Sequence, residues 1–239
     1  MKPRTAISWS GGKDSYLALH RSLPDYNVVA MITMFGEDGA RSRSHGLRPS
    51  ILDAQAGRLR LPIFAGRGSW ATYESDYLQA LEDARSLDIT HVIFGDIMYD
   101  SNRVFPERVC ATLGLTAVEP LWNEPTDALF REFVATGADA RIVTVREGVL
   151  DPSWLGRRLT VPMLDDIERA GIDPCGEHGE YHTVVLDAPL FASPLHVTFG
   201  EQVLRSGCWA VDLEEADALR VCRLVRLRPP GRHSAVHTQ

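Results

Sequence analysis

The stretch ISWSGGKDSYLALHRS, residues 7–22, decides the fold of the amino-terminal half. It begins with a short apolar run and ends with apolar side chains at helical spacing. The intervening SGGKDS, residues 10–15, is therefore predicted to turn from a strand into a helix. Backbone N–H groups at a helix start lack intrahelical partners and face whatever occupies the turn. This geometry predicts an anion-binding loop.

The small residues of the turn suit it to phosphate. Gly11 and Gly12 permit positive φ angles and a close approach of the main chain to a phosphate group. The hydroxyls of Ser10 and Ser15 can donate further hydrogen bonds. The alternative is a Gly-Gly turn that only links strand and helix, with its charged neighbours in solvent.

Two charged residues complete the turn. Lys13 adds a compact positive charge, and Lys2 is the only other lysine in the chain. Asp14 would repel phosphates unless a divalent cation lay between them, so we expect Mg²⁺ to bridge this carboxylate and a pyrophosphate group. The order of residues is not that of the Walker loop, which requires G-x-x-x-x-G-K-[ST].

The first half of the chain alternates short apolar runs with amphipathic segments. This pattern predicts an α/β fold with a doubly wound, mostly parallel sheet. The expected strands are 5–9, 27–35, 61–65 and 91–95, and the expected helices are 14–21, 50–60, 73–86 and 104–113. Because such sheets bind ligands at the carboxyl ends of their strands, the turns after Trp9, Phe35 and Gly95 should meet in one crevice.

The alternation ends at PLWNEP, residues 120–125, where two prolines favour a domain border. We therefore expect a first domain at 1–122, a smaller α+β domain at 123–228 and a flexible tail at 229–239. The expected elements of the second domain are helices 127–136 and 161–170 and strands 182–186, 195–200 and 221–227.

Composition excludes several classes of protein. The net charge of −7 disfavours a broad nucleic-acid surface. Four scattered cysteines, without a C-x-x-C pair, argue against a disulfide framework or a zinc site. No apolar run has the length of a signal peptide or membrane span, so we expect a cytoplasmic protein without membrane contact.

Asp96 and His45 are candidate ligand contacts by topology. Asp96 follows Gly95 at the end of an expected strand, where it could hold Mg²⁺ or a nucleotide or serve only as a turn former. His45 lies after the second strand, on the crevice side, and could contact ribose or phosphate. A solvated loop histidine is the alternative.

Two further residues carry open alternatives. Arg103 could clamp a carboxylate or a departing pyrophosphate, or it could form a surface ion pair with Glu107 at i,i+4 spacing. Cys175 could be a nucleophile, although lone cysteines are more often buried apolar groups.

Four polar residues crowd the segment 177–182: Glu177, His178, Glu180 and His182. Such side chains suggest a metal site. In a strand, however, Glu180 and His182 would share a face that excludes Glu177, so a three-ligand site would need a bent backbone. Contact with substrate or nucleotide and structural hydrogen bonding are the alternatives.

SGGKDS resembles the PP-loop of the N-type ATP pyrophosphatases. Four more segments resemble the diphthine ammonia ligase family within that superfamily: VIFGDI at 92–97, ERVCATLGL at 107–115, EPLW at 119–122 and DPCGEHGEYHT at 173–183. The resemblance extends to about Phe191. The chain departs from the family pattern at Phe105, where a second arginine is usual, and at His178, where asparagine is common.

The resemblance implies an adenine nucleotide α-hydrolase-like fold, with ATP bound by residues 1–122 and substrate by residues 123–228. It implies catalytic roles for Lys13, Asp14 and Arg103. The implied ATP contacts are Ser10, Gly11, Gly12, Lys13, Asp14, Ser15, His45, Gly95 and Asp96, with Mg²⁺ on Asp14 and Asp96. The implied substrate contacts are Glu107, Gly176, Glu177, Gly179, Glu180, His182 and Thr183.

The implied reaction is adenylation of a carboxylate with release of pyrophosphate, followed by amidation with ammonia. The family's usual substrate is diphthine on elongation factor 2, whereas a bacterial protein would need another carboxylate. Phe105 leaves that choice open. The alternatives are a PP-loop enzyme that modifies tRNA and a regulatory module that holds ATP or AMP without chemistry. The oligomeric state is also left open, with a homodimer as one alternative.

Overall fold

The computed structural model describes residues 1–216, apart from the side chains of residues 100–102. Its amino-terminal part is a five-stranded, fully parallel sheet in the order β3-β2-β1-β4-β5. The strands are β1 (Arg4–Ser8), β2 (Asn27–Phe35), β3 (Ile63–Arg67), β4 (His91–Ile93) and β5 (Thr116–Val118). This is the doubly wound α/β architecture that the sequence predicts.

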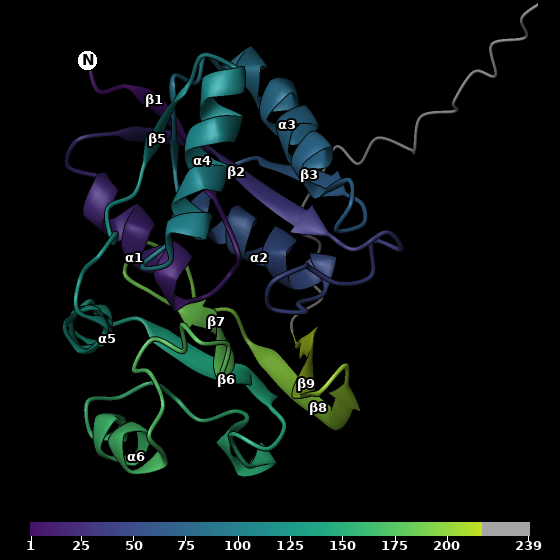
Figure 1. Cartoon of the computed structure of the whole chain (residues 1–239), viewed down its shortest axis with the longest axis vertical. Helices are drawn as coiled ribbons and strands as arrows, with labels where there is room; N and C mark the ends of the chain where they lie inside the picture. The colour runs from purple at the N-terminus through teal and green to yellow at the C-terminus, as the bar shows by residue number, and fades with distance from the viewer. Residues whose placement is uncertain (217–239) are drawn as a thin grey trace, which may run out of the picture.

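Helices cover both faces of this sheet. The helices are α1 (Lys13–Ser22), α2 (Pro49–Leu59), α3 (Tyr73–Ala84) and α4 (Asp100–Thr112), and a 3₁₀ turn, η1 (Arg85–Leu87), follows α3. Successive strand residues point to opposite faces. Accordingly, Ala6 packs in one buried cluster with α3 and α4, and Ile7 packs in the other with α1 and α2. Figure 1 shows α3 and α4 together on one side.

The order in which strands are added to the sheet reverses between β1 and β4. It runs outward from β1 through β2 to β3 and then returns to add β4 and β5 on the other side. Ligands of open α/β sheets bind at such a switch point, outside the carboxyl ends of the strands. The turns that begin at Trp9 and Phe94 therefore flank the place where a ligand is expected.

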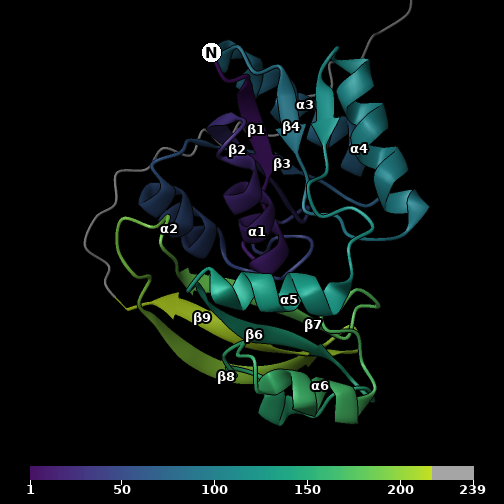
Figure 2. The same cartoon turned by 90° about the vertical axis from the view of Figure 1, so that its left-hand side faces the viewer.

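The second part is a four-stranded antiparallel sheet in the order β7-β6-β9-β8. Its strands are β6 (Asp139–Arg146), β7 (Tyr181–Asp187), β8 (Val197–Arg205) and β9 (Cys208–Glu215), and its helical segments are α5 (Thr126–Ala135), η2 (Pro152–Trp154) and α6 (Met163–Ala170). Figure 2 shows α5 and α6 on opposite sides of this sheet. The smaller α+β domain predicted from the sequence is thus present.

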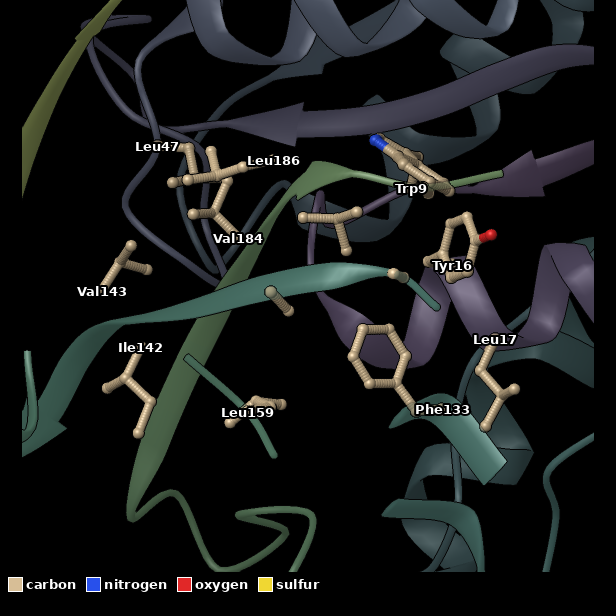
Figure 3. Packing of buried hydrophobic residues seen from close by; sticks show 14 of the residues in the cluster. Trp9, Tyr16, Leu17, Leu47, Phe133, Ile142, Val143, Leu159, Val184 and Leu186 are labelled. Carbon is tan, nitrogen blue, oxygen red and sulfur yellow. The ribbon is translucent and has the colours of Figure 1, made fainter. Parts of the chain in front are cut away.

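One apolar cluster joins the two sheets. Tyr16 of α1 meets Phe133 of α5 edge-on, with ring centroids 6.0 Å apart. The same cluster contains Trp9 from the end of β1, and Ile142 and Val184 from the second sheet (Figure 3). Helix α1 is therefore packed between the parallel sheet and the second domain, and the turn that precedes it faces both. The domain border at residues 122 and 123 stays a prediction.

Several sequence expectations need correction. From the sequence we predict no strand at β6 or β9, although apolar and polar residues alternate there. β5 has three residues, which is too short to give a pattern. β3 runs from Ile63 to Arg67 rather than 61–65, because Arg60 ends α2 in a left-handed conformation and Leu61 still hydrogen-bonds back to Ala56.

The strand expected at 221–227, Cys222 and the tail at 229–239 lie outside the described residues. In residues 1–216, no helix has the length and apolar character needed to cross a bilayer.

Candidate active site

A cavity of about 440 Å³ lies at the carboxyl ends of β1 and β4, against the second domain. This volume falls within the roughly 300–1,000 Å³ typical of small-molecule sites. Residues from three regions line it: Ser8, Ser10, Lys13, Asp14 and Ser15 around the first turn; Ser44, His45, Tyr73, Phe94, Gly95, Asp96 and Phe105; and Cys175, Gly176, Glu177, Gly179, Tyr181, His182 and Thr183. The crevice expected from the strand ends is therefore real, and its far wall comes from the second domain.

Gly11 and Gly12 fit where a side chain would not, and they do not themselves line the cavity. Gly11 has φ +86°, a left-handed conformation that favours glycine. Gly12 has an ordinary φ of −98° and begins α1, but a Cβ atom there would lie 2.2 Å from Cε1 of His45. Neither glycine lines the cavity. Their predicted role as direct ATP contacts stays a prediction, and the structure shows why only glycine fits at both positions.

Lys13 is buried at the start of α1, with 3% of its surface exposed. Its Nζ lies 2.8 Å from the Asp14 carboxylate and also donates to the carbonyl of Cys175. Its backbone N–H donates to the Thr183 hydroxyl at 3.0 Å. Burial lowers the pKa of Lys13, but the charges of Asp14, Cys175 and Tyr181 and the hydrogen bond to Asp14 together outweigh burial and raise the pKa above 10.5. The side chain is therefore a permanent cation that both domains hold in place.

Carboxylates outnumber cations in the cavity wall. Burial raises the pKa of Asp96 to about 7, and the charges of Glu119 and Asp14 add to that shift. Burial likewise raises the pKa of Glu177 to about 7, with a further contribution from Asp14. Because Asp14, Asp96 and Glu177 repel one another around the single ammonium of Lys13, the site is poised for an additional cation.

His45 and His182 form a neutral pair beside the turn. Their ring centroids lie 4.8 Å apart, and His45 Nδ1 lies 2.6 Å from the carbonyl of Thr183. Because a carbonyl can only accept, this nitrogen carries the proton and Nε2 does not. Burial lowers the pKa of His45 to about 4 and that of His182 to about 3. Both predicted contacts thus reach the cavity as uncharged imidazoles.

Glu180 holds the loop before β7 together rather than lining the cavity. It is buried, and its carboxylate accepts hydrogen bonds from the backbone N–H groups of Asp173, at 3.2 Å, and His178, at 2.9 Å. Its neighbour His182 does line the cavity. Of the roles left open for Glu180, the geometry fits structural hydrogen bonding, which shapes the loop that carries Glu177.

Arg103 and Glu107 do not line the cavity. They lie on the exposed surface of α4 and form an ion pair at 2.9 Å. Arg103 also lies 3.6 Å from Glu119, and its guanidinium is 5.6 Å from the ring of Trp122. This is the i,i+4 surface pair that the sequence left as the alternative to a substrate clamp.

Cys175 is a buried thiol rather than a nucleophile. Its Sγ donates to the carbonyl of Thr126 at 3.3 Å, and burial raises the pKa of the thiol. A thiol held protonated in this way is a poor nucleophile. Its carbonyl, which accepts from Lys13, is the part of Cys175 that serves the site.

Aromatic residues line part of the cavity that the sequence did not assign. Tyr73, Phe94, Phe105 and Tyr181 all line it, and Phe105 packs against Tyr73 with ring centroids 5.5 Å apart. Burial raises the pKa of Tyr73 to about 12, and the nearby Asp96 adds to the shift. Phe94 directly precedes Gly95 at a strand end, which is a signal that could have identified it. Phe105 is marked only as a departure from the family pattern, and Tyr73 carries no signal in the sequence.

A metal held by protein ligands alone finds no support in residues 1–216. Among the described side chains, which leave out those of residues 100–102, no three His, Cys, Asp or Glu are arranged as a metal-binding group, so the segment 177–182 does not form one. Mg²⁺, by contrast, is commonly bound through one or two carboxylates together with phosphates and waters. Asp14 and Asp96, which share the cavity wall, fit that requirement.

Comparisons with known proteins identify relatives across most of the chain. The family description "Diphthamide synthase N-terminal domain" matches residues 3–117, and "Diphthamide synthase C-terminal domain" matches residues 125–217. The chain is 30% identical to the diphthine–ammonia ligase of Rattus norvegicus, covering 85% of this chain and 86% of that protein. It is 28% identical to the diphthine–ammonia ligase of Homo sapiens over the same shares.

A solved structure, described as a predicted subunit of a tRNA methyltransferase from Methanocaldococcus jannaschii, is a more distant match. It shows 14% sequence identity and a TM-score of 0.39, covering 78% of this chain and 98% of that one. A likeness at this level bears on neither mechanism nor substrate.

Proposed function

Because the chain belongs to the diphthamide synthase family, whose relatives are carbon–nitrogen ligases, we propose that it forms an amide from a carboxylate and ammonia at the expense of ATP. ATP would be cleaved between its α- and β-phosphates. The cavity at the switch point of the parallel sheet would hold the nucleotide and the carboxylate together.

The buried ammonium of Lys13 is the observation that carries this proposal. It lies at the first turn of α1, where the Lys13 N–H is bonded to the Thr183 hydroxyl and the N-cap, Gly12, has no side chain to bond the N–H groups that follow. A helix start of this kind is an anion site, and its dipole adds to the lysine charge. The adjoining cavity of about 440 Å³ leaves room for phosphates beside Lys13.

In the first step, a carboxylate oxygen of the substrate attacks the α-phosphorus of ATP. A new O–P bond forms, the bond to the bridging oxygen breaks, and pyrophosphate leaves with that electron pair. Lys13 and the N–H groups of the turn stabilise the charge that develops on the leaving group. The product bound to the enzyme is an acyl-adenylate.

In the second step, ammonia attacks the carbonyl carbon of the acyl-adenylate. A C–N bond forms, the C–O bond to AMP breaks, and the nitrogen loses one proton. Glu177 is the group that we assign to accept this proton, because it lines the cavity and its pKa of about 7 suits a general base at neutral pH. Amide and AMP are the products.

Mg²⁺ would be held by Asp14 and Asp96. Once bound, it would neutralise charge on the phosphates of ATP and lower the pKa of Asp14 and Asp96, the carboxylates that hold it. The raised pKa of Asp96 is the feature of this chain that supports such a site. Asp14 would then exchange its ion pair with Lys13 for the metal, leaving the ammonium available to phosphate.

The substrate is proposed at the level of a carboxylate. The named relatives act on diphthine. In this chain, Phe105 and Tyr73 give one wall of the cavity an aromatic surface, so a carboxylate carried beside a flat or apolar group fits best.

Nucleotide analysis after incubation with ATP, Mg²⁺, ammonium and candidate carboxylates tests the reaction. We expect AMP and pyrophosphate in equal amounts, and Lys13→Ala should lower their formation by roughly 10²–10³-fold, as removal of a transition-state donor does. Lys2→Ala is the matched control, since Lys2 lies at the surface, where it donates to the carbonyl of Leu23.

ADP as the only product would contradict the α,β-cleavage. ATP that stays bound and intact through long incubation would favour a regulatory module instead. Turnover that depends on added tRNA would favour the tRNA-modifying alternative.

A further inference from the structure

A second cavity, of about 310 Å³, lies beside the candidate active site. Its walls are the loop from Arg41 to Arg48, which follows β2, and the hairpin of β8 and β9. Its volume is at the lower end of the roughly 300–1,000 Å³ of small-molecule sites. The family resemblance and the proposed reaction leave this cavity without a role.

The two cavities share a wall. Ser44, His45 and His182 line both of them. The two imidazoles are uncharged at neutral pH, because burial lowers the pKa of each. The shared wall is thus electrically neutral, and none of the three residues that line both cavities carries a carboxylate.

The cavities differ in the sign of their charge. Asp14, Asp96 and Glu177 face Lys13 in the active-site cavity. The second cavity is lined by four arginines, Arg41, Arg43, Arg48 and Arg205, and by one acidic residue, Asp212. In a chain of net charge −7, this concentration of arginine is a local exception. A cleft lined by one sign of charge concentrates ligands of the opposite sign.

The arginines are only partly satisfied by protein groups. Arg41 and Arg48 share the carboxylate of Asp212, and Arg48 also lies 3.3 Å from Glu214. Arg43 donates to the carbonyl of Gly68 and stacks on Trp70, while its buried Nε has no hydrogen-bond partner.

Arg205, at the end of β8, lies within 4.0 Å of no carboxylate in the described part of the chain. It also borders a neighbouring hollow that contains Glu201 and Glu214. Since guanidinium groups bind phosphate oxygens through paired hydrogen bonds, the set as a whole suits a phosphate-bearing anion.

We propose that the arginine-lined cavity is a second anion site, which takes the pyrophosphate released in the neighbouring cavity. The inference rests on the proposed function for the identity of the anion. Pyrophosphate leaves a cavity in which Lys13 is the one cationic side chain of the wall and enters one that four arginines line. His45 and His182 lie in the wall between the two cavities, and the second site separates the product from the acyl-adenylate with which it would otherwise react back.

Calorimetric titration of the full chain with inorganic pyrophosphate tests the site. With the first cavity saturated by an ATP analogue that has a methylene group between its α- and β-phosphorus atoms, we expect one pyrophosphate to bind per chain. Arg205→Glu should weaken that binding by tenfold or more. Arg131→Glu, on the exposed surface of α5, makes the same change in net charge away from both cavities and should leave binding unchanged.

Arg205→Gln, which removes the charge without reversing it, should have an intermediate effect. Melting curves of all three variants check that the fold is intact. No pyrophosphate binding in the presence of the analogue, or equal binding by wild type and Arg205→Glu, would overturn the proposal. Orthophosphate binding as tight as pyrophosphate, or a second analogue bound per chain, would overturn the assignment to pyrophosphate.

The titration needs no turnover, so it is independent of the reaction test. If ATP is not cleaved to AMP and pyrophosphate, the proposed function fails while the site sensitive to Arg205→Glu can still be measured. If ATP is cleaved and that site is absent, only the second anion site fails.

Discussion

Asp96 carries a pKa of about 7 because three conditions meet at one residue. It is largely buried, it lies near Glu119 and Asp14, and among the described side chains no cation pairs with it as Lys13 pairs with Asp14. Groups whose pKa is shifted by burial and like charge concentrate at functional sites, where a ligand relieves the repulsion. At the scale of single residues, the site is thus built at the expense of stability in the absence of ligand.

The destabilisation caused by Asp96 can be measured in the nucleotide-free protein by comparing the wild type with Asp96→Asn. The folded pKa of Asp96 is raised, so its favourable contribution is complete below about pH 4 and is lost as the pH rises through about 7. Asp96→Asn should therefore raise the free energy of unfolding by about 1–3 kcal/mol at pH 8 and by little at pH 4. Denaturant titrations at the two pH values measure it.

Asp25→Asn, at an exposed position, is the control for this experiment and should show no such difference. His45 and His182 have lowered pKa values, so their stabilising contributions are lost as the pH falls below about 6.5. That loss occurs equally in wild type and in Asp96→Asn, so the difference between the two proteins isolates Asp96. A difference that does not grow with pH would contradict the assignment.

The turn between β1 and α1 is the element on which the site depends. Its residues were predicted from sequence, but the reason for Gly12 lies elsewhere in the chain. The space that a side chain would need is filled by His45 and by the carbonyl of Thr183, whose oxygen lies 3.1 Å from the point that a Cβ atom would occupy. The conformation of Gly12 itself is open to any residue, because its φ is −98°. Glycine is therefore required at position 12 by the packing of residues distant in the sequence, and not by the local backbone conformation.

Gly12→Ala should consequently disturb both the fold and the reaction. The new methyl group must displace His45 or the turn, which we expect to cost about 1–3 kcal/mol of stability, as overpacking does. AMP formation should fall by more than tenfold, because the turn N–H groups move. Gly200→Ala is the matched control, since its nearest neighbour would be an ordinary 3.5 Å away. Melting curves and nucleotide analysis give the two readouts; equal behaviour of both variants would exclude the packing argument.

At the scale of the whole molecule, the two domains share one buried cluster. It extends from Ile7 and Leu17, through Phe133, to Ile142 and Val184 in the second sheet (Figure 3). Lys13 crosses the same border through the carbonyl of Cys175, and its backbone does so through Thr183. An active site built on this border needs the domains to be fixed to one another.

Thermal unfolding of the full chain should accordingly be a single cooperative transition. Shared burial couples the domains, so neither should melt while the other stays folded. Scanning calorimetry that gives equal calorimetric and van't Hoff enthalpies is the expected result. Residues 1–122 expressed alone should melt at a lower temperature than the full chain, because they expose the apolar faces of α1 and α2. Two resolved transitions would show that the shared cluster contributes little.

The sequence by itself determined the parallel sheet, the glycine-rich turn from strand to helix at residues 10–15 and the presence of a smaller second domain. These depend on local patterns, since periodicity and glycine placement reflect the chemistry of neighbouring residues. β6 and β9 were missed because their role as partners in a sheet is fixed by distant strands.

Tertiary structure alone decided which side chains share the cavity. It placed Glu180 in the loop rather than in the cavity wall, paired Arg103 with Glu107, and brought Tyr73 and Phe105 to the site. It also set the raised pKa of Asp96. The physical reason is that burial and the distances between charges depend on how remote segments pack, which no window of neighbouring residues encodes.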